Sequence, residues 1–126
     1  MKATLFVIAI LLGVLLLPVG LLYSVLYRIA FTPYTTAKVS DYFYTCSLAI
    51  DQLGNVFCSD LFNTFLIHGS SPVMFGDPDQ TISAVLGYAQ HSDSLTSLGD
   101  IMVNFLDAID EDHCKKAMEL DMKTAK

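Results

Sequence analysis

Side chains able to do chemistry are concentrated in residues 75–87, which read FGDPDQTISAVLG. The polar half of this stretch holds Asp77, Asp79, Gln80, Thr81 and Ser83 within seven residues, and the remainder is apolar. Carboxylate, amide and hydroxyl groups at this density suit a catalytic site or a ligand-binding loop, but they also suit the start of a helix. The chemistry of the stretch therefore depends on which of these residues the helix itself uses.

A helix beginning at Asp77 would use most of these polar residues. Asp77 fits an N-cap, and Pro78 fits the first helical position, where a missing N–H has no cost. Asp79 in the first turn is favourable to the helix dipole, and Gln80 lies at the capping-box spacing from Asp77. The two hydroxyl residues that follow have no role in such a start, so they remain candidates for a site.

His113 and Cys114 form a second chemically capable pair. Cys114 could act as a nucleophile with His113 or His68 as its base, and the pair could ligate zinc. Adjacent helical residues point about 100° apart, and no C-x-x-C or second histidine stands at ligand spacing. A free cysteine on an apolar face is most often a small core residue. The common nucleotide-binding, zinc-protease and serine-hydrolase motifs are also missing, so we expect no catalytic residue, no metal and no cofactor.

The interpretation that we prefer for the polar motif residues is structural. Asp51, Gln52 and Asn55 fall on one face of a predicted helix, because residues three and four apart are neighbours there. Polar residues of two later segments could interlock with them through buried side-chain hydrogen bonds that hold three helices together. The candidate residues for this network are Asp51, Gln52, Asn55, Asp79, Thr81, Ser83, Asp112, His113 and Cys114.

The elements expected to position these residues are all helices. The first covers residues 41–58 and extends through DLFNTFLI, the second follows Asp77, and the third covers Ser97 to Ile109 with Ser97 as its cap. The fourth lies in DEDHCKKAMELDMK, with Asp110 or Asp112 as its cap. The periodicity predicts these buried residues: Phe43, Cys46, Ile50, Leu53 and Phe57 in the first helix, Ile82, Val85, Leu86 and Ala89 in the second, Leu98, Met102, Phe105 and Ile109, widened by Ile101 and Leu106, in the third, and Cys114, Ala117, Met118 and Met122 in the fourth.

A different kind of segment precedes these helices. Residues 3–27 carry no charge over 25 positions, and about 20 apolar residues cross a bilayer core as a helix. The alternative is a cleaved signal peptide, but no A-x-A cleavage pattern follows, and the apolar run exceeds the usual length. We therefore predict an all-α chain with a single N-terminal transmembrane helix, residues 3–27, a juxtamembrane linker, residues 28–40, and a small acidic domain of about four helices, residues 41–126.

The charge of the chain limits its partners. Residues 29–126 carry 13 acidic side chains against five basic ones, so the domain would repel nucleic acid phosphates and has no basic cluster for anionic lipid. We therefore expect contact with the lipid bilayer through residues 3–27, a membrane or other protein partner, and no binding of nucleic acid.

Three fragments of the chain resemble a group of small uncharacterised phage and prophage proteins. The group's D-Q-x-x-N motif matches Asp51, Gln52 and Asn55, its P-D-E-T-[IL]-S motif matches residues 78–83, and its D-H-C motif matches residues 112–114. Gln80 replaces the usual glutamate, the segment from residue 57 to 75 is longer than in the group, and the arginines usual after the second motif are missing. The resemblance covers roughly half of the chain, omits residues 3–27, and implies a viral origin without a mechanism.

These observations together predict a membrane-anchored, non-enzymatic interaction module that serves as a phage or prophage accessory protein. The alternatives are a small metal- or thiol-dependent hydrolase and a lysis or superinfection-related membrane protein. The expected location is the bacterial inner membrane with a single span. The signal-like N-terminus favours a domain on the outer side of the membrane, whereas three cysteines, an odd number, favour the reducing cytoplasmic side, which we prefer.

Overall fold

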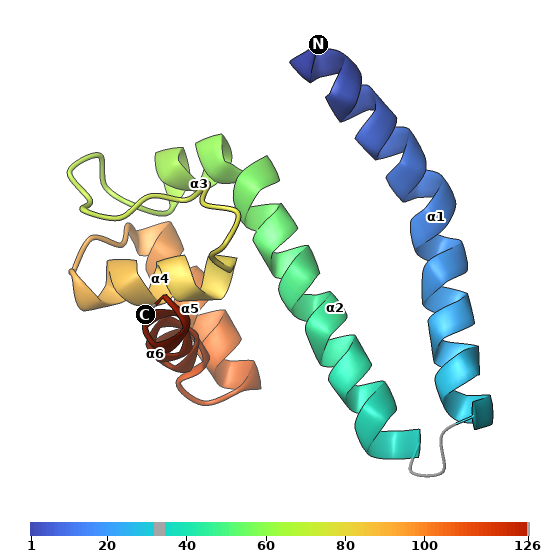
Figure 1. Ribbon diagram of the computed structural model, residues 1–126. Helices are drawn as coiled ribbons and strands as arrows, with labels where there is room; N and C mark the ends of the chain where they lie inside the picture. Colours follow the sequence, from blue (N-terminus) through green and yellow to red (C-terminus); the bar gives the residue numbers. More distant parts are fainter. Residues whose placement is uncertain (32–34, 126) are drawn as a thin grey trace. The chain divides into compact units, whose positions relative to one another are not determined.

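The computed structural model describes residues 1–31 and 35–125 and is built from helices (Figure 1). Six α-helices follow one another in this described part of the chain, which contains no β-strand. The all-α prediction is therefore confirmed. The chain divides into two compact units, Met1–Thr45 and Cys46–Lys126, which are described separately.

The first unit contains the long apolar helix α1, Lys2–Phe31. Its 30 residues would span about 45 Å at about 1.5 Å per residue, more than the roughly 30 Å of a bilayer core. The most apolar 18-residue window has a mean hydropathy of 3.0, and none of it is buried. Pro18 lies inside the helix, which membrane helices tolerate. Helix α1 is thus long and apolar enough to cross a membrane, a property that signal sequences share.

The segment predicted as a linker, residues 28–40, is mostly helical where it is described. Helix α1 continues to Phe31, α2 covers Thr35–Phe57, and residues 32–34 lie outside the described part. The guanidinium of Arg28 lies 4.8 Å from the centre of the Tyr42 ring, a cation–π contact between α1 and α2 within the first unit. Helix α2 begins at Thr35, six residues before the start at residue 41 that the apolar periodicity predicts.

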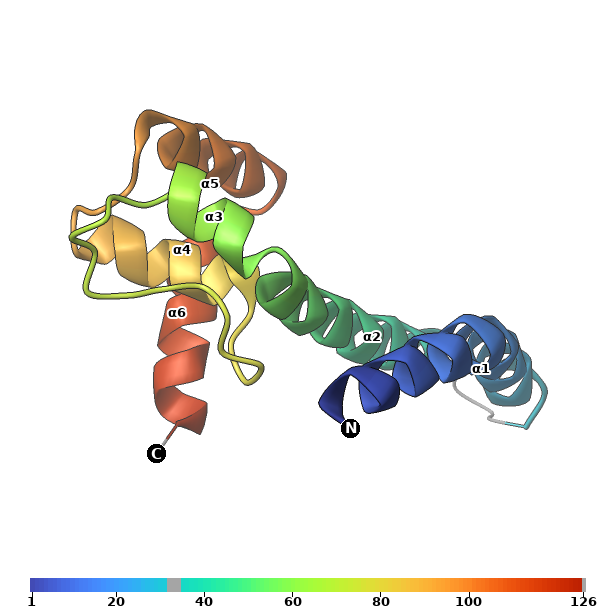
Figure 2. The same ribbon diagram turned by 90° about the horizontal axis from the view of Figure 1, so that it is seen from above.

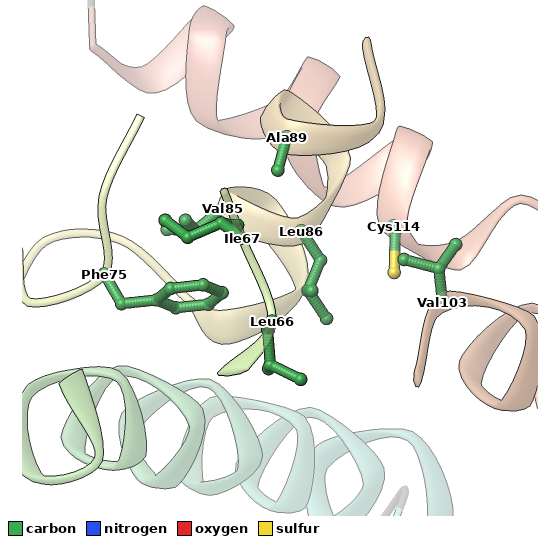
Figure 3. Close-up of a cluster of buried hydrophobic side chains, with 8 residues drawn as sticks. All are labelled: Leu66, Ile67, Phe75, Val85, Leu86, Ala89, Val103 and Cys114. Atoms are coloured by element: carbon green, nitrogen blue, oxygen red, sulfur yellow. The ribbon is translucent and has the colours of Figure 1, made fainter. Parts of the chain in front are cut away.

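The second unit is organised around α4, Ile82–His91, which packs on α5, Ser97–Ile109, and most extensively on α6, His113–Thr124 (Figures 1 and 2). The short helix α3, Ser59–Phe65, follows α2 after a break at Cys58. The core is a cluster of buried apolar side chains that come from α4, α5, α6 and the segments around α3, namely Leu66, Ile67, Phe75, Val85, Leu86, Ala89, Val103 and Cys114 (Figure 3).

Two glycines permit the close approaches in this unit. A Cβ atom at Gly87 would lie 2.3 Å from the carbonyl oxygen of Cys114, so α4 and α6 meet backbone to backbone. A Cβ atom at Gly99 would lie 2.3 Å from the carbonyl oxygen of Leu66, which places the start of α5 against the end of α3. Any larger residue at either position would force the elements apart, because real Cβ atoms essentially never approach so closely.

The predicted helix start at Asp77 and the predicted cap at Ser97 are wrong, whereas the predicted bounds Ser97–Ile109 agree with α5. Helix α4 begins at Ile82, and its N-cap is Thr81, whose hydroxyl oxygen accepts from the Ala84 N–H at 3.1 Å. Asp77 instead shapes the preceding turn, where its carboxylate accepts from the Asp79 N–H at 2.9 Å. The N-cap of α5 is likewise one residue earlier than predicted, because the Thr96 hydroxyl accepts from the Gly99 N–H at 3.2 Å.

Several predicted core positions are on the surface. On α2, Ile50 is 68% exposed, and Phe43, Leu53 and Phe57 are exposed as well, whereas Asn55 on the polar face is fully buried. The polar face therefore turns inward, because its amide and carboxylate groups bond to the backbone of residues 76–82. The other mispredicted positions, also exposed, are Leu98, Ile101, Phe105 and Ile109 on α5 and Met122 on α6.

Candidate functional site

The candidate site starts with Asn55, an amide at 0% exposure near the end of α2. Its nitrogen donates to the carbonyl oxygens of Asp77 at 2.9 Å and Gln80 at 2.8 Å. Its oxygen accepts from the N–H of Gly76 at 3.0 Å. Gly76 has a φ of +125°, a conformation that glycine adopts without strain. One buried side chain therefore shapes the turn that leads into α4.

Two further amides hold the same loop. The Asn63 side chain accepts from the Phe75 N–H at 2.8 Å and donates to the Phe75 carbonyl at 3.0 Å. The Gln52 side chain donates to the carbonyl of Asp79 at 3.2 Å. Sequence reasoning missed Asn63, although its spacing of eight residues from Asn55 on a continuous helical pattern is a signal for a shared face.

Asp51 supplies a carboxylate to the start of α4. One of its oxygens accepts from the Ile82 N–H at 2.9 Å, and the other lies 3.3 Å from the Ser83 hydroxyl oxygen. The first N–H groups of a helix have no partner within the helix, and a negative charge is favourable there. Asp51 and Thr81 therefore cap the same helix from two different segments of the chain.

Asp51 begins a row of five side chains that continues through Ser83, His113, Asp110 and Lys116. The Ser83 hydroxyl lies 3.1 Å from Nε2 of His113, and Nδ1 of His113 lies 3.1 Å from a carboxylate oxygen of Asp110. The other Asp110 oxygen accepts from Lys116 at 3.2 Å. The hydrogen bond from His113, followed by the bond and charge of Lys116, lowers the pKa of Asp110 below its usual range. The row links α2, α4 and the start of α6.

The protons on the two ring nitrogens of His113 decide the direction of the hydrogen bonds in this row. Ionised carboxylates only accept hydrogen bonds, so His113 needs a proton on Nδ1 to donate to Asp110. With a neutral ring, Nε2 accepts from Ser83, and the hydroxyl has no proton left for Asp51. With a charged ring, Nε2 donates to Ser83, and the hydroxyl proton turns to Asp51. All three contacts are hydrogen bonds at the same time only when both ring nitrogens of His113 carry a proton.

The same atoms have the order of a Ser-His-Asp triad, Ser83–His113–Asp110. A nucleophile must reach its substrate, but Ser83 is only 5% exposed. An oxyanion needs N–H donors, but the N–H of Ile82 is bonded to Asp51 and that of Ala84 to Thr81. Asp51 also competes with His113 for the hydroxyl proton. The arrangement is suited to joining helices rather than to attacking a substrate.

Cys114 is a core residue with no exposed surface. Burial, and then the negative charges of Asp107 and Asp51, raise the pKa of its thiol to about 12. The thiolate is the reactive form of cysteine, so this thiol is a poor nucleophile at neutral pH. Within the described part of the chain, no group of three or more His, Cys, Asp or Glu side chains is arranged to hold a metal ion.

A second polar contact between helices involves Asp121 on α6, which sequence reasoning also missed. One of its carboxylate oxygens accepts from the Tyr88 hydroxyl at 2.8 Å and from the Gln80 amide at 3.2 Å. Burial, and then the bond to Asp121 and its charge, raise the pKa of Tyr88 to about 12. No local spacing indicates this contact, because Tyr88 and Asp121 are 33 residues apart.

The structure brings the predicted motif residues into one region but gives them different roles. Asp51, Ser83 and His113 belong to the row of side chains, and Gln52 and Asn55 hold the turn. Thr81 is a cap, while Asp79 accepts through its carbonyl oxygen. Asp112 precedes α6 with a left-handed backbone, φ 56°, and makes no side-chain capping bond. Cys114 packs in the core.

Comparisons with protein-family models, with curated proteins and with solved structures found no match to this chain.

Proposed function

We propose that the chain is a membrane-anchored interaction module without enzymatic activity. The supporting observation is the distribution of side chains in the unit Cys46–Lys126. Its polar motif residues bond to one another and to nearby backbone, whereas many large apolar side chains lie on its surface. A binding protein uses surface of this kind, and an enzyme needs accessible polar groups instead.

Helix α1 is the proposed anchor, with residues 3–27 in the lipid bilayer. Its length and mean hydropathy support a single span, and we place it in the bacterial inner membrane. The three cysteines are free, and Cys114 is buried in reduced form. Free thiols persist in reducing compartments, which supports a domain on the cytoplasmic side.

The proposed role is that of a phage or prophage accessory protein acting on a membrane protein of the host or phage. Support comes from the three motifs, in particular Asp51, Asn55 and residues 78–83, which resemble those of phage and prophage proteins. A thiol-dependent hydrolase has less support because Cys114 is buried with a raised pKa. A lysis protein has less support because a folded acidic unit follows the span.

Carbonate extraction of membranes from cells that express the full chain tests the anchor. We expect the protein to stay in the pellet, and a variant with Leu11→Arg and Leu15→Arg to move to the soluble fraction. Each charge costs about 2.5–3.5 kcal/mol at the centre of a membrane helix. The matched control is the variant with Leu11→Ala and Leu15→Ala, which should remain in the pellet. Recovery of a wild-type chain shortened at its N-terminus would contradict the anchor and indicate a signal peptide.

Photo-crosslinking in cells tests the interaction. A photoreactive residue placed at each exposed apolar position of the unit Cys46–Lys126 should give discrete crosslinked products at some of them. Matched positions in polar surface, such as Gln90 and Ser70, should give none. Failure to form a discrete product at any apolar position would contradict the proposed function.

A further inference from the structure

Helix α5 has apolar side chains that do not pack against the core. Leu98, Ile101, Phe105 and Ile109 are 51%, 63%, 62% and 71% exposed, and their spacings of three, four and four place them in one stripe. The part of the helix that faces the core is made by other residues, among them the buried Gly99 and Val103. We call the four exposed residues the α5 stripe.

The apolar arc of α5 is unusually wide. At about 100° per residue, the positions from Val103 through Met102 and Leu106 to the α5 stripe cover roughly 200° of the helix circumference. A surface helix of a globular protein needs an apolar stripe of about 100° to face its core. About half of the apolar arc of α5 therefore faces away from the core, and a second helix could bury it.

The segment of sequence that contains α5 carries charge of one sign. No Lys or Arg occurs from residue 39 to 114, whereas eleven Asp and Glu residues do. Asp100 is exposed on α5, and Asp110, Glu111 and Asp112 follow its C-terminal end. The nearest basic side chains in sequence begin α6, and one of them, Lys116, is paired with Asp110.

This charge distinguishes between the possible occupants of the stripe. Two copies of α5 packed together would bring two sets of carboxylates into proximity, and like charges across an interface are unfavourable. An anionic bilayer surface would repel the same carboxylates. A partner with Lys or Arg beside an apolar stripe would satisfy both the apolar and the charged parts of this surface.

We infer that the α5 stripe is the docking site for an amphipathic α-helix of a partner protein, with Lys or Arg residues flanking its apolar face. This inference rests on the proposed function and names its binding surface. The bound helix would lie against α5 at about 8–10 Å between helix axes, with its basic residues near Glu111 and Asp112, the exposed carboxylates that follow the C-terminal end of α5.

The test uses the full chain in neutral-lipid nanodiscs and a synthetic helical peptide with leucines at alternating spacings of three and four, flanked by lysines. A peptide with glutamates in place of the lysines is its matched control, and empty nanodiscs give the background. Fluorescence anisotropy should show that the lysine peptide binds at least tenfold more tightly than the glutamate peptide. Raising the salt concentration from 50 to 500 mM should weaken binding by several-fold.

Two variants locate the site. The variant with Ile101→Ser and Phe105→Ser should weaken binding of the lysine peptide at least tenfold, with an unchanged circular dichroism spectrum. The control variant with Ile50→Ser and Leu61→Ser removes two exposed apolar residues elsewhere in the unit and keeps the charge, so it should leave binding within about twofold.

Four outcomes would overturn the inference. One is equal loss of peptide binding in both variants, and another is self-association of the wild type that the Ile101→Ser and Phe105→Ser variant abolishes. The third is protection of α5 from hydrogen exchange by anionic lipid without peptide. Cellular crosslinks from Ile50 or Leu61 but not from Ile101 or Phe105 would also overturn it, while leaving the proposed function standing. Absence of crosslinks from every apolar position would remove the proposed function itself.

Discussion

Replacement of Asn55 by alanine is the most informative change to the turn before α4. The side chain is fully buried and makes three hydrogen bonds, at 2.9, 2.8 and 3.0 Å, to the backbone of Asp77, Gln80 and Gly76. A typical intramolecular hydrogen bond contributes about 0.5–1.5 kcal/mol net, and each buried group that loses its partner costs about 1–3 kcal/mol. Water entering the vacated space would replace some of these bonds, so we expect Asn55→Ala to lower the free energy of unfolding by about 3 kcal/mol.

Such a loss is large for a unit of this size. The free energy of unfolding of a small domain is about 5–15 kcal/mol. A loss of about 1 kcal/mol lowers the melting temperature of a domain of 60–100 residues by roughly 4–8 °C. The measurement is urea and thermal unfolding of the full chain in detergent, followed by circular dichroism. A more local measurement is hydrogen exchange at the Gly76 N–H, which Asn55 protects in the wild type and which should exchange faster in the variant.

Two controls separate hydrogen bonding from packing. Asn55→Asp keeps the volume but replaces the donor to two carbonyl oxygens by an acceptor, so it should destabilise at least as strongly as Asn55→Ala. Asn104→Ala changes an exposed asparagine on α5 and should stay within about 0.5 kcal/mol of the wild type. A loss below about 1 kcal/mol for Asn55→Ala, with unchanged exchange at Gly76, would refute the role given to this residue.

Four further predictions concern residues of the same region. Thr81→Ala should cost about 1 kcal/mol in urea unfolding, more than Asp77→Ala, because Thr81 is the cap of α4; a larger loss for Asp77→Ala would contradict this. Cys114, whose pKa is raised to about 12, should react with maleimide at pH 8 only after unfolding; labelling in the folded state would contradict its burial. Tyr88 has its pKa raised from 10.0 to about 12, so its stabilising contribution should be complete below pH 10 and lost as the pH rises towards 12; pH-dependent unfolding of Tyr88→Phe should lack that part of the loss. A fluorophosphonate probe should not label Ser83, because this side chain is only 5% exposed; labelling that Ser83→Ala abolishes would contradict the non-enzymatic function and indicate a serine hydrolase.

The buried face of α2 could not be predicted from the sequence. A helical period reveals two faces, and the usual rule assigns the apolar one to the core. In the structure, Ile50 and Leu53 are exposed while Asn55 is buried. The rule fails here because the backbone of residues 76–82 presents N–H and carbonyl groups that match the side chains of Asp51 and Asn55. That match involves residues more than 20 positions apart, so no local pattern contains it.

The start of α4 illustrates the same limit at a smaller scale. Asp77 and Pro78 satisfy every local rule for a helix start, yet the helix begins at Ile82. The carbonyl oxygens of Asp77 and Gln80 are bonded to Asn55, and the Asp77 carbonyl also accepts from the Gln80 N–H in a turn. A helix from Asp77 would direct these carbonyl oxygens along its own axis. The distant amide therefore decides the boundary.

The sequence by itself determined the properties that depend on neighbours along the chain. The uncharged run of residues 3–27 produces the long apolar helix α1, and the apolar periods predict the helical class and the bounds Ser97–Ile109. Only the tertiary structure decided which face of α2 turns inward, which residues cap α4, and how Ser83, His113 and Asp110 meet. The physical reason is that helix formation depends on residues within four positions, whereas burial and hydrogen-bond pairing depend on groups that only folding brings together.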